Sequence, residues 1–362
     1  MYRALKIIML LIGTFVCTNF GYTQINNVED LLRGGLDDAN LLLKEYLTPF
    51  GKGFGADLNN GWFNTAKTHK FLGFDITVTA NAAIAPTSDE TFDISKLGLQ
   101  NLRLTDPNAD PKTPTIVGED ESGPELSLFL NNPITGEPDS LTAFEMPQGI
   151  GFRYVPSPMI QASLGLFANT EVMLRFFPEI EVSKDVGSLK MFGLGVKHDL
   201  KQWLPGGGLL PFDLSVMAGY TIFQAHADLS LEPDPDLTPT GASYEDQKVE
   251  LEATSFTLNF LISKQFAILT LFGGLGIETS SVDLKLKGNY PVTVFEDDPN
   301  SSNFGEEVIE DLVNPVNISI DGANTMRANV GFRLKLVFLT IHGSYTFSNY
   351  PVATAGVGIN VR

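Results

Sequence analysis

Cysteine is nearly absent from this sequence: its 362 residues contain one, Cys17. It lies in an N-terminal stretch typical of an export signal, in which Arg3 and Lys6 precede an apolar run of about ten residues. Small residues stand at the third and the first position before Gln24, which are the positions that signal peptidase recognises. They predict cleavage before Gln24, so residues 1–23 are interpreted as a signal peptide. The mature chain then lacks thiols, which excludes disulfides and cysteine metal sites. A retained anchor is disfavoured because the run is too short, and a lipoprotein because Val16 stands where a small residue is needed.

Long apolar runs and an excess of basic charge are also missing. No later segment has eighteen uninterrupted apolar residues, which excludes helical membrane spans. The net charge is −19, and the whole acid excess falls in residues 81–143, 229–249 and 287–323. Nucleic-acid binding is excluded because it requires a basic face. The three segments are predicted to be long, solvated loops outside the cell.

What the sequence does contain is alternation of apolar and polar residues. Between residues 326 and 336, every even position is apolar, whereas the odd positions carry Arg327, Asn329, Gly331, Arg333 and Lys335. Successive side chains of a strand point to opposite faces, so one face is apolar and the other carries three cations. A soluble sandwich also buries one face. The recurrence of this pattern over about ten residues, with a polar face rich in charge and Gly, favours a transmembrane barrel instead.

Eleven segments follow this pattern: 72–79, 145–154, 160–166, 171–176, 190–199, 213–222, 255–263, 267–278, 326–336, 339–347 and 353–361. Single-chain bacterial barrels have even strand numbers, so at least one more strand is expected, with residues 92–104 as the candidate. The predicted fold is all-β: an antiparallel transmembrane β-barrel of about 12 to 14 strands over residues 64–362. Short turns are expected on the periplasmic side and the acidic loops outside.

The segment ahead of the barrel, residues 24–63, is predicted to be a plug or periplasmic gate. Residues 24–47 have helical spacing after candidate caps at Asn26 and Asn27. From residue 46 to 63 the chain is rich in Gly, Asn and aromatic residues, which predicts irregular structure. The residues expected to plug the barrel mouth are Pro49, Phe50, Phe54 and Trp62.

The inward positions of the predicted strands carry charges of both signs. They are expected to line the lumen, either as a cross-strand network that braces it or as a selectivity surface for a solute. These residues are Asp75, Glu145, Arg153, Glu171, Arg175, Lys197, Asp199, Asp213, Glu278, Arg327, Arg333, Lys335 and His342.

No motif indicates an enzyme. A phospholipase site could use His226, but no sequence context marks a matching serine. Acidic groups such as Asp106, Asn108 and Asp110 have spacings that resemble calcium ligands, but interleaved prolines and the missing closing Glu break an EF-hand loop. We expect no catalytic residues, no metal site and no cofactor. The acidic groups are interpreted as solvated loops, and weak calcium binding by these loops is the alternative.

At residues 53–62 (GFGADLNNGW) and 193–200 (GLGVKHDL), the chain resembles an uncharacterised family of outer-membrane β-barrels of Bacteroidota, over nearly the whole mature chain. It is more distantly similar to the FadL-type long-chain fatty-acid transporters. That likeness rests on the helix ahead of the barrel and on the Gly-aromatic segment around Thr48, Pro49 and Phe50. It implies an N-terminal hatch inside a fourteen-stranded barrel that passes hydrophobic molecules, although the Asn-Pro-Ala hatch motif is absent.

Two functions are compatible with the sequence. The first is a passive outer-membrane transport channel for small molecules, hydrophobic ones among them. The second is a non-transporting accessory barrel of an envelope assembly, secretion or surface complex, which docks through its acidic loops or N-terminal helix. The expected partners are outer-membrane lipid, a hydrophobic small molecule in the first case, and other envelope proteins in the second. Nucleic acid is not expected.

Overall fold

The computed structural model describes residues 36–131, 138–183, 187–238, 240–296 and 298–361. The predicted signal peptide, residues 1–23, and the first part of the predicted helix, residues 24–35, lie outside the described residues. None of the described helices combines the length and the apolar character needed to cross a membrane.

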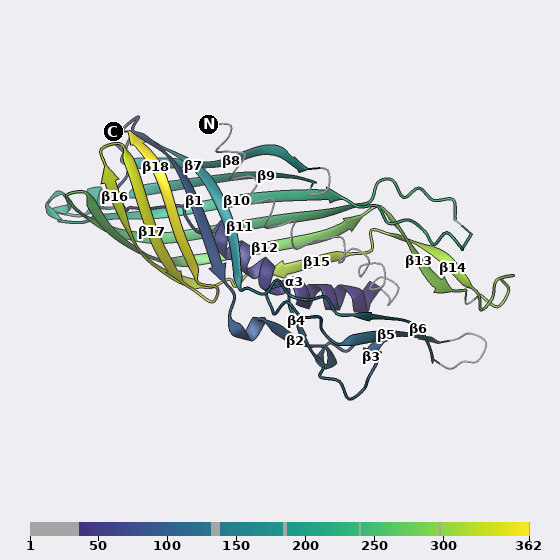
Figure 1. The fold of residues 1–362 in the computed structure, drawn as a ribbon. Helices are drawn as coiled ribbons and strands as arrows, with labels where there is room; N and C mark the ends of the chain where they lie inside the picture. The colour runs from purple at the N-terminus through teal and green to yellow at the C-terminus, as the bar shows by residue number, and fades with distance from the viewer. Residues whose placement is uncertain (1–35, 132–137, 184–186, 239, 297, 362) are drawn as a thin grey trace.

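Ten strands form a closed antiparallel ring (Figure 1). Each pairs with the next in the order below, and the last pairs with the first over ten residue pairs. The ring consists of β1 (Phe74–Ile84), β7 (Tyr154–Gly165), β8 (Thr170–Ser183), β9 (Gly187–Asp199), β10 (Asp213–Asp228), β11 (Lys248–Phe266), β12 (Leu269–Lys287), β16 (Met326–Leu336), β17 (Leu339–Phe347) and β18 (Val352–Val361).

An eleventh strand, β15 (Asn317–Asp321), lies in line with β16. Strand β15 pairs with residues 281–285 of β12, whereas β16 pairs with residues 269–277 of the same strand. Together β15 and β16 therefore complete one side of β12.

The predicted all-β barrel with an N-terminal helix is confirmed, with ten strands in the ring instead of twelve to fourteen. The prediction of a strand at 145–154 is wrong. Strand β6 (Pro138–Glu145) ends at the first residue of this range, and β7 starts at its last residue, Tyr154. Between them, Gly151 has a φ of +73°, which interrupts an extended strand. Residues 92–104 contribute only the short strands β2 (Thr91–Asp93) and β3 (Leu102–Leu104), which lie outside the ring.

The alternation in the sequence separates the outside of the ring from its inside. On β16, Arg327, Asn329 and Arg333 are buried, whereas Val330 and Phe332 are exposed. Because the sheet closes on itself and its apolar positions stay exposed, the sandwich alternative is excluded for the described residues. The outer face forms an apolar belt that includes Ile76, Phe192, Leu194, Phe256, Leu258, Phe260, Leu271, Leu275, Phe332, Ile341 and Ile359.

The two ends of the ring differ. At one, which we call the short-turn end, the strands are joined by residues 166–169, 200–212, 267–268 and 337–338. The second connection includes η3 (Lys201–Trp203) and η4 (Gly207–Leu209). The opposite end of the ring, which we call the long-loop end, carries the long connections. Their described parts belong to residues 85–153, 229–247 and 288–325, which contain most of the acidic segments. The charge of the chain is therefore concentrated at one end of the barrel.

The long loops have structure of their own. Residues 85–131 and 138–153 form a lobe with a separate apolar core, to which the N-terminal helix contributes Ala39 and Leu42. The lobe contains η1 (Thr87–Asp89), η2 (Ile94–Lys96), β4 (Lys112–Pro114) and β5 (Glu125–Asn131) besides β2, β3 and β6. Residues 288–325 include the hairpin of β13 (Asn289–Phe295) and β14 (Glu307–Val313), which projects from the barrel in Figure 1.

A phenol ties this lobe to the ring. The Tyr350 hydroxyl, in the turn between β17 and β18, donates a hydrogen bond to the Asp89 carboxylate. Burial, and then this carboxylate, raise the pKa of Tyr350 above its usual range. The lobe is thus anchored to the wall of the barrel by a partly buried polar contact.

Candidate functional site: the N-terminal segment inside the barrel

Helix α3 (Leu36–Leu58) begins among the long loops and ends inside the ring (Figure 1). Near its start, the Asp38 carboxylate accepts the backbone N–H groups of Gln100, Asn101 and Leu102 at 2.8 to 3.0 Å. The chain then descends the lumen and joins β1 at the short-turn end, where the N–H of Leu72 donates to the carbonyl of Gly165. We call residues 51–70, which occupy the lumen, the internal segment.

Helix α3 continues through glycines for which the sequence predicted irregular structure. These positions are glycine because the wall of the barrel leaves no room for a larger side chain. A Cβ on Gly51 would lie 2.9 Å from Ile320 of β15, and one on Gly53 would lie 2.8 Å from Val155 of β7. A Cβ on Gly55 would collide with the side chain of Ser280 on β12. Glycine weakens a helix by about 1 kcal/mol relative to alanine. Glycine nevertheless fits these three positions, because the helix is packed closely between opposite walls of the ring.

Two buried arginines cap the C-terminal end of α3, where helix carbonyls lack intrahelical partners and the helix dipole is negative. Arg175 of β8 donates to the carbonyl oxygens of Leu58 and Asn60 at 2.8 and 2.5 Å. Arg327 of β16 donates to the carbonyl of Asn59 at 2.7 Å and to the side-chain oxygen of Asn60. It also forms an ion pair of 3.2 Å with Glu278 of β12. The helix end is therefore held from two sides of the wall.

Trp62 follows this cap and packs inside the lumen against the wall formed by β8, β9 and β10. It is 1% exposed, and the Arg175 guanidinium lies 3.7 Å from the centroid of its ring. The wall makes room for the indole with glycines: a Cβ on Gly195 of β9 or on Gly219 of β10 would lie 2.8 or 2.6 Å from it. The Gln161 side chain donates to the Trp62 carbonyl at 3.0 Å.

A second ionic cluster holds the lower end of the internal segment. Glu171 of β8 accepts both the backbone N–H and the ring Nδ1 of His69, at 3.0 and 2.8 Å. The other oxygen of Glu171 lies 3.0 Å from the Lys197 ammonium. On its far side, the His69 ring lies 2.7 Å from the amide of Asn360 and 3.5 Å from the Asp75 carboxylate. Each of these five side chains is less than a tenth exposed.

Most of the predicted lumen residues lie in the lumen. Lys335 is partly buried there and donates to Asn360 at 2.5 Å. Asp199 and Asp213 lie at the short-turn end, where Asp213 faces Lys201 at 3.5 Å. The eight side chains that are buried inside the ring are Asp75, Glu171, Arg175, Lys197, Glu278, Arg327, Arg333 and His342.

Two predictions of lumen residues are wrong. Glu145 is exposed at the end of β6, outside the ring. Arg153 precedes β7 and pairs with Glu90 of the lobe at 3.2 Å. Both errors follow from the strand that was wrongly predicted at 145–154.

The predicted plug residues occupy two levels. Trp62 lies deeper in the lumen, whereas Phe54 contacts Phe223 of β10 near the long-loop end and stacks on Phe50. Pro49 lies within α3. The segment therefore extends from the long-loop end into the lumen and is not confined to the mouth at the short-turn end.

Several residues of the site were not predicted. Asp57, Asn59, Asn60 and His69 are buried, and Gln161 lies on the inner face of β7. The alternation of β7 identifies Gln161 as an inward position, but nothing in the sequence marks the others, because they lie outside the strands. With Asp57 included, the lumen holds four buried carboxyl side chains and four buried Lys and Arg side chains.

A small cavity of about 10 Å³ remains between the internal segment and the wall, beside Trp62, His69 and Lys197. Such a space holds about one water molecule. In the parts of the chain that the structure describes, no three His, Cys, Asp or Glu side chains converge to hold a metal ion.

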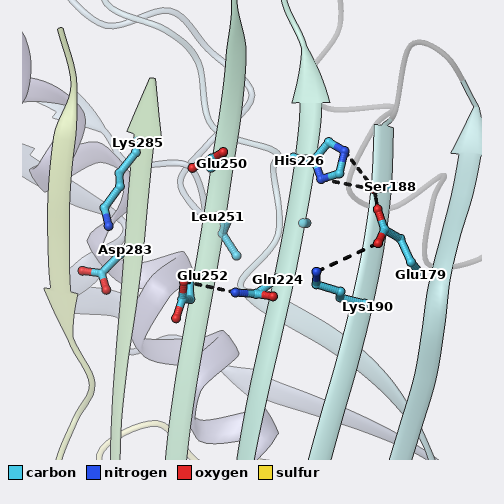
Figure 2. Close-up of a pocket in the computed structure, with 11 residues that line it drawn as sticks. Glu179, Ser188, Lys190, Gln224, His226, Glu250, Leu251, Glu252, Asp283 and Lys285 are labelled. Carbon is cyan, nitrogen blue, oxygen red and sulfur yellow. Dashed lines mark hydrogen bonds and ion pairs between the residues drawn. The ribbon is translucent and has the colours of Figure 1, made fainter. Parts of the chain in front are cut away.

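A larger depression, of about 190 Å³, lies on the outer face of β8 to β12 (Figure 2). Its charged and polar side chains occupy outward positions next to the apolar belt, on the side of the long loops. Lys190 lies 3.9 Å from Glu179, and Gln224 donates to Glu252 at 3.3 Å. This row marks where the outer face changes from apolar to charged.

Solved structures resemble this chain only loosely. Ail of Yersinia pestis, in complex with the heparin analogue sucrose octasulfate, matches with a TM-score of 0.23 and 10% identity over 80% of this chain and 99% of Ail. The translocator domain of autotransporter NalP from Neisseria meningitidis matches with 0.28 and 12% over 81% and 90%. CdiB from Acinetobacter baumannii matches with 0.22 and 8% over 79% and 60%.

Similarities this low carry no argument about function. No curated protein matches the chain. The family described as "Family of unknown function (DUF6588)" matches residues 1–361, and the chain therefore belongs to that family.

Proposed function

We propose that this protein is an outer-membrane barrel that its own N-terminal segment keeps closed, and that it serves as an accessory anchor for the structured loops at its long-loop end. The apolar belt supports placement in a membrane, because an outward-facing apolar band is the surface that a transmembrane barrel presents to lipid. The long loops are placed outside the cell and the short turns in the periplasm, as is usual for such barrels. Export through the predicted signal peptide belongs to the same proposal.

The observation that carries the proposal is the anchoring of the internal segment at two levels, at residues 58–60 and at His69. Four charge-assisted bonds join Arg175 and Arg327 to residues 58–60. Such bonds contribute about 1.5–3 kcal/mol each, so that withdrawing the segment costs about 6–12 kcal/mol at this cap alone. Since about 1.4 kcal/mol corresponds to a tenfold change, the open form is populated at about 10⁻⁴ or less. A barrel closed this firmly is suited to anchoring rather than to continuous diffusion.

Conductance across planar bilayers tests the proposal. The wild-type protein is expected to give no steady current, whereas a variant lacking residues 51–63 is expected to conduct. Replacing Lys190 by Ala on the outer face is the matched control and should leave the barrel closed. Steady conductance by the wild type would refute the closed state. Affinity purification from detergent extracts then tests the accessory role, which requires stoichiometric envelope proteins.

A second candidate is passive transport of small hydrophobic molecules, and one feature favours it. Strands β7 and β8 pair over five residues only, 161–165 with 171–175, although both extend further toward the long-loop end. Pro156, Pro158 and Pro178 lie on these strands and lack backbone N–H groups, which opposes further pairing. A gap in the ladder that faces lipid would let an apolar molecule leave the lumen sideways.

Uptake of a hydrophobic dye by protein-containing liposomes, compared with empty liposomes, distinguishes the two functions. Uptake by the wild type without ionic conductance would favour transport. The candidate does not depend on the resemblance to FadL-type transporters, which implied fourteen strands where the ring has ten. That relationship and an origin in Bacteroidota stay predictions.

A further inference from the structure

The depression in Figure 2 lies on the side of the barrel where the strands are longest. Strands β8 to β12 have 13 to 19 residues, whereas β1, β7, β16, β17 and β18 have 9 to 12. On these five shorter strands, all of which the structure describes, no outward position carries a charged side chain. The charged part of the outer face is therefore a local surface on one side of the ring, not a collar around it.

The height of the depression places it at the level of lipid headgroups. Residues 252–266 of β11 and residues 269–283 of β12 span the distance from the depression to the short-turn end. At about 3.3 Å per residue and a strand tilt of about 40°, this distance is about 35 Å along the barrel axis. The hydrocarbon core of a bilayer is about 30 Å thick, and the whole bilayer about 40–45 Å. With the strand ends at the lower edge of the core, Glu252 and Asp283 lie just beyond its upper edge.

Like charges face each other at two levels of this surface. The register of β11 and β12 places Glu252 opposite Asp283, and it places Lys248 opposite Lys287 closer to the long loops. Like charges directly opposite each other destabilise a sheet. Gln224 donates to one oxygen of Glu252 at 3.3 Å. Figure 2 shows no hydrogen bond or ion pair of Asp283 with the other residues that line the depression.

Between the two like-charged pairs lies a pair of opposite charge. Glu250 is opposite Lys285, and it also forms an ion pair of 2.9 Å with Lys248. From the apolar belt outward, the surface therefore presents two carboxylates first and lysines after them. A ligand that relieves both repulsions has hydrogen-bond donors near the belt and an anionic group further out.

We propose that this surface binds the headgroup of one lipid of the outer leaflet, and that this lipid carries its acyl chains on a phosphorylated sugar. Glu252 and Asp283 accept hydrogen bonds from hydroxyl and amide groups of the sugar, next to the belt along which the acyl chains lie. Lys285 and Lys287 bind a phosphate further out, because the lysine ammonium is a common phosphate ligand. The proposal rests on the proposed function for the placement in a membrane and for the orientation of the long loops.

The order of the charges opposes an ordinary phospholipid such as phosphatidylethanolamine. In that lipid the phosphate lies between the acyl chains and the ammonium group, so the phosphate would meet the carboxylates and the ammonium group the lysines. A bound metal ion is not supported either, because no three His, Cys, Asp or Glu side chains converge among the described residues. A soluble protein would have to displace lipid headgroups to reach a surface at this level. The acylated phosphosugar matches both pairs and the neighbouring belt, which Phe192 and Phe256 continue.

Native mass spectrometry of the detergent-purified full chain tests the proposal. The probes are lipid A, which is an acylated glucosamine disaccharide with two phosphates, and phosphatidylethanolamine. The wild-type protein is expected to retain one lipid A under conditions that remove phosphatidylethanolamine. Lys287→Glu should weaken the binding of lipid A about tenfold or more, because repulsion replaces a charge-assisted bond. Lys264→Glu makes the same charge change at an exposed position near the short-turn end and is the matched control.

The unfolding temperature gives a second measurement. Asp283→Asn should raise it in lipid-free detergent, because the like-charge contact with Glu252 is removed, and should reduce the increase that lipid A causes in the wild type. Equal retention of the two lipids by the wild type would overturn the proposal, as would equal binding of lipid A by Lys287→Glu and Lys264→Glu. Either result leaves the closed barrel and its conductance test unaffected. A wild-type protein that stays dissolved without detergent and retains neither lipid would instead refute the placement in a membrane, and the headgroup site with it.

Discussion

Replacing Arg175 by Met is expected to loosen the internal segment without unfolding the barrel. The change removes two charge-assisted bonds to the carbonyls of Leu58 and Asn60, and the contact of the guanidinium with the Trp62 ring. The two bonds alone contribute about 3–6 kcal/mol. Relief of the desolvation of a fully buried cation offsets part of this loss. We therefore expect a net loss of about 3 kcal/mol, which raises the population of the released segment about 10²-fold.

Hydrogen exchange measured by mass spectrometry on detergent-purified protein checks this expectation. Amides of residues 57–66 should exchange faster by about that factor, whereas amides of β16 and β17 should keep their protection. Lys190→Met removes a cation of the exposed outer face and is the matched control. If Arg175→Met leaves residues 57–66 as protected as in the wild type, the cap does not hold the segment and the reasoning fails.

Three further changes address other levels of the barrel. Gly219→Ala sets a methyl group against the indole of the internal segment and should lower stability by about 1–3 kcal/mol, seen as a lower unfolding temperature, whereas Gly208→Ala, which meets nothing within 4 Å, should not. Glu171→Gln leaves a buried lysine without its counter-charge, so it should cost about 3–5 kcal/mol and expose the lower part of the segment to added protease; equal protease resistance in Glu171→Gln and the exposed control Glu145→Gln would contradict this. Asp38→Ala removes the acceptor of three backbone N–H groups in the lobe and should speed proteolysis of residues 85–131 while conductance stays absent.

The sequence predicted the wall of the barrel well because each strand carries its own signal. Ten of the eleven alternating segments are strands of the ring, since exposure to lipid on one face and a polar interior on the other impose the same period on all of them. The prediction for the remaining segment, residues 145–154, was wrong because two glycines and an aromatic residue imitate the alternation by chance. Glu145 and Arg153 were placed in the lumen by that one error.

The contents of the lumen were harder to predict, because they depend on contacts between distant parts of the chain. A helix through Gly51, Gly53 and Gly55 contradicts helix propensity, and only the walls on either side explain it. Asn60 and His69 have no periodic neighbours, so their burial cannot be read from spacing. Nor does the sequence specify from which end the segment enters.

The ring is closed by pairing between its first and last strands, β1 and β18. The two strands lie far apart in the chain, because β1 directly follows the internal segment and β18 comes after every other described strand. The ring therefore cannot close before all the strands of its wall have been made. Arg175 of β8 and Arg327 of β16, which hold the end of α3 from two sides, belong to that same wall. The binding surface for the internal segment is thus complete only at the end of assembly.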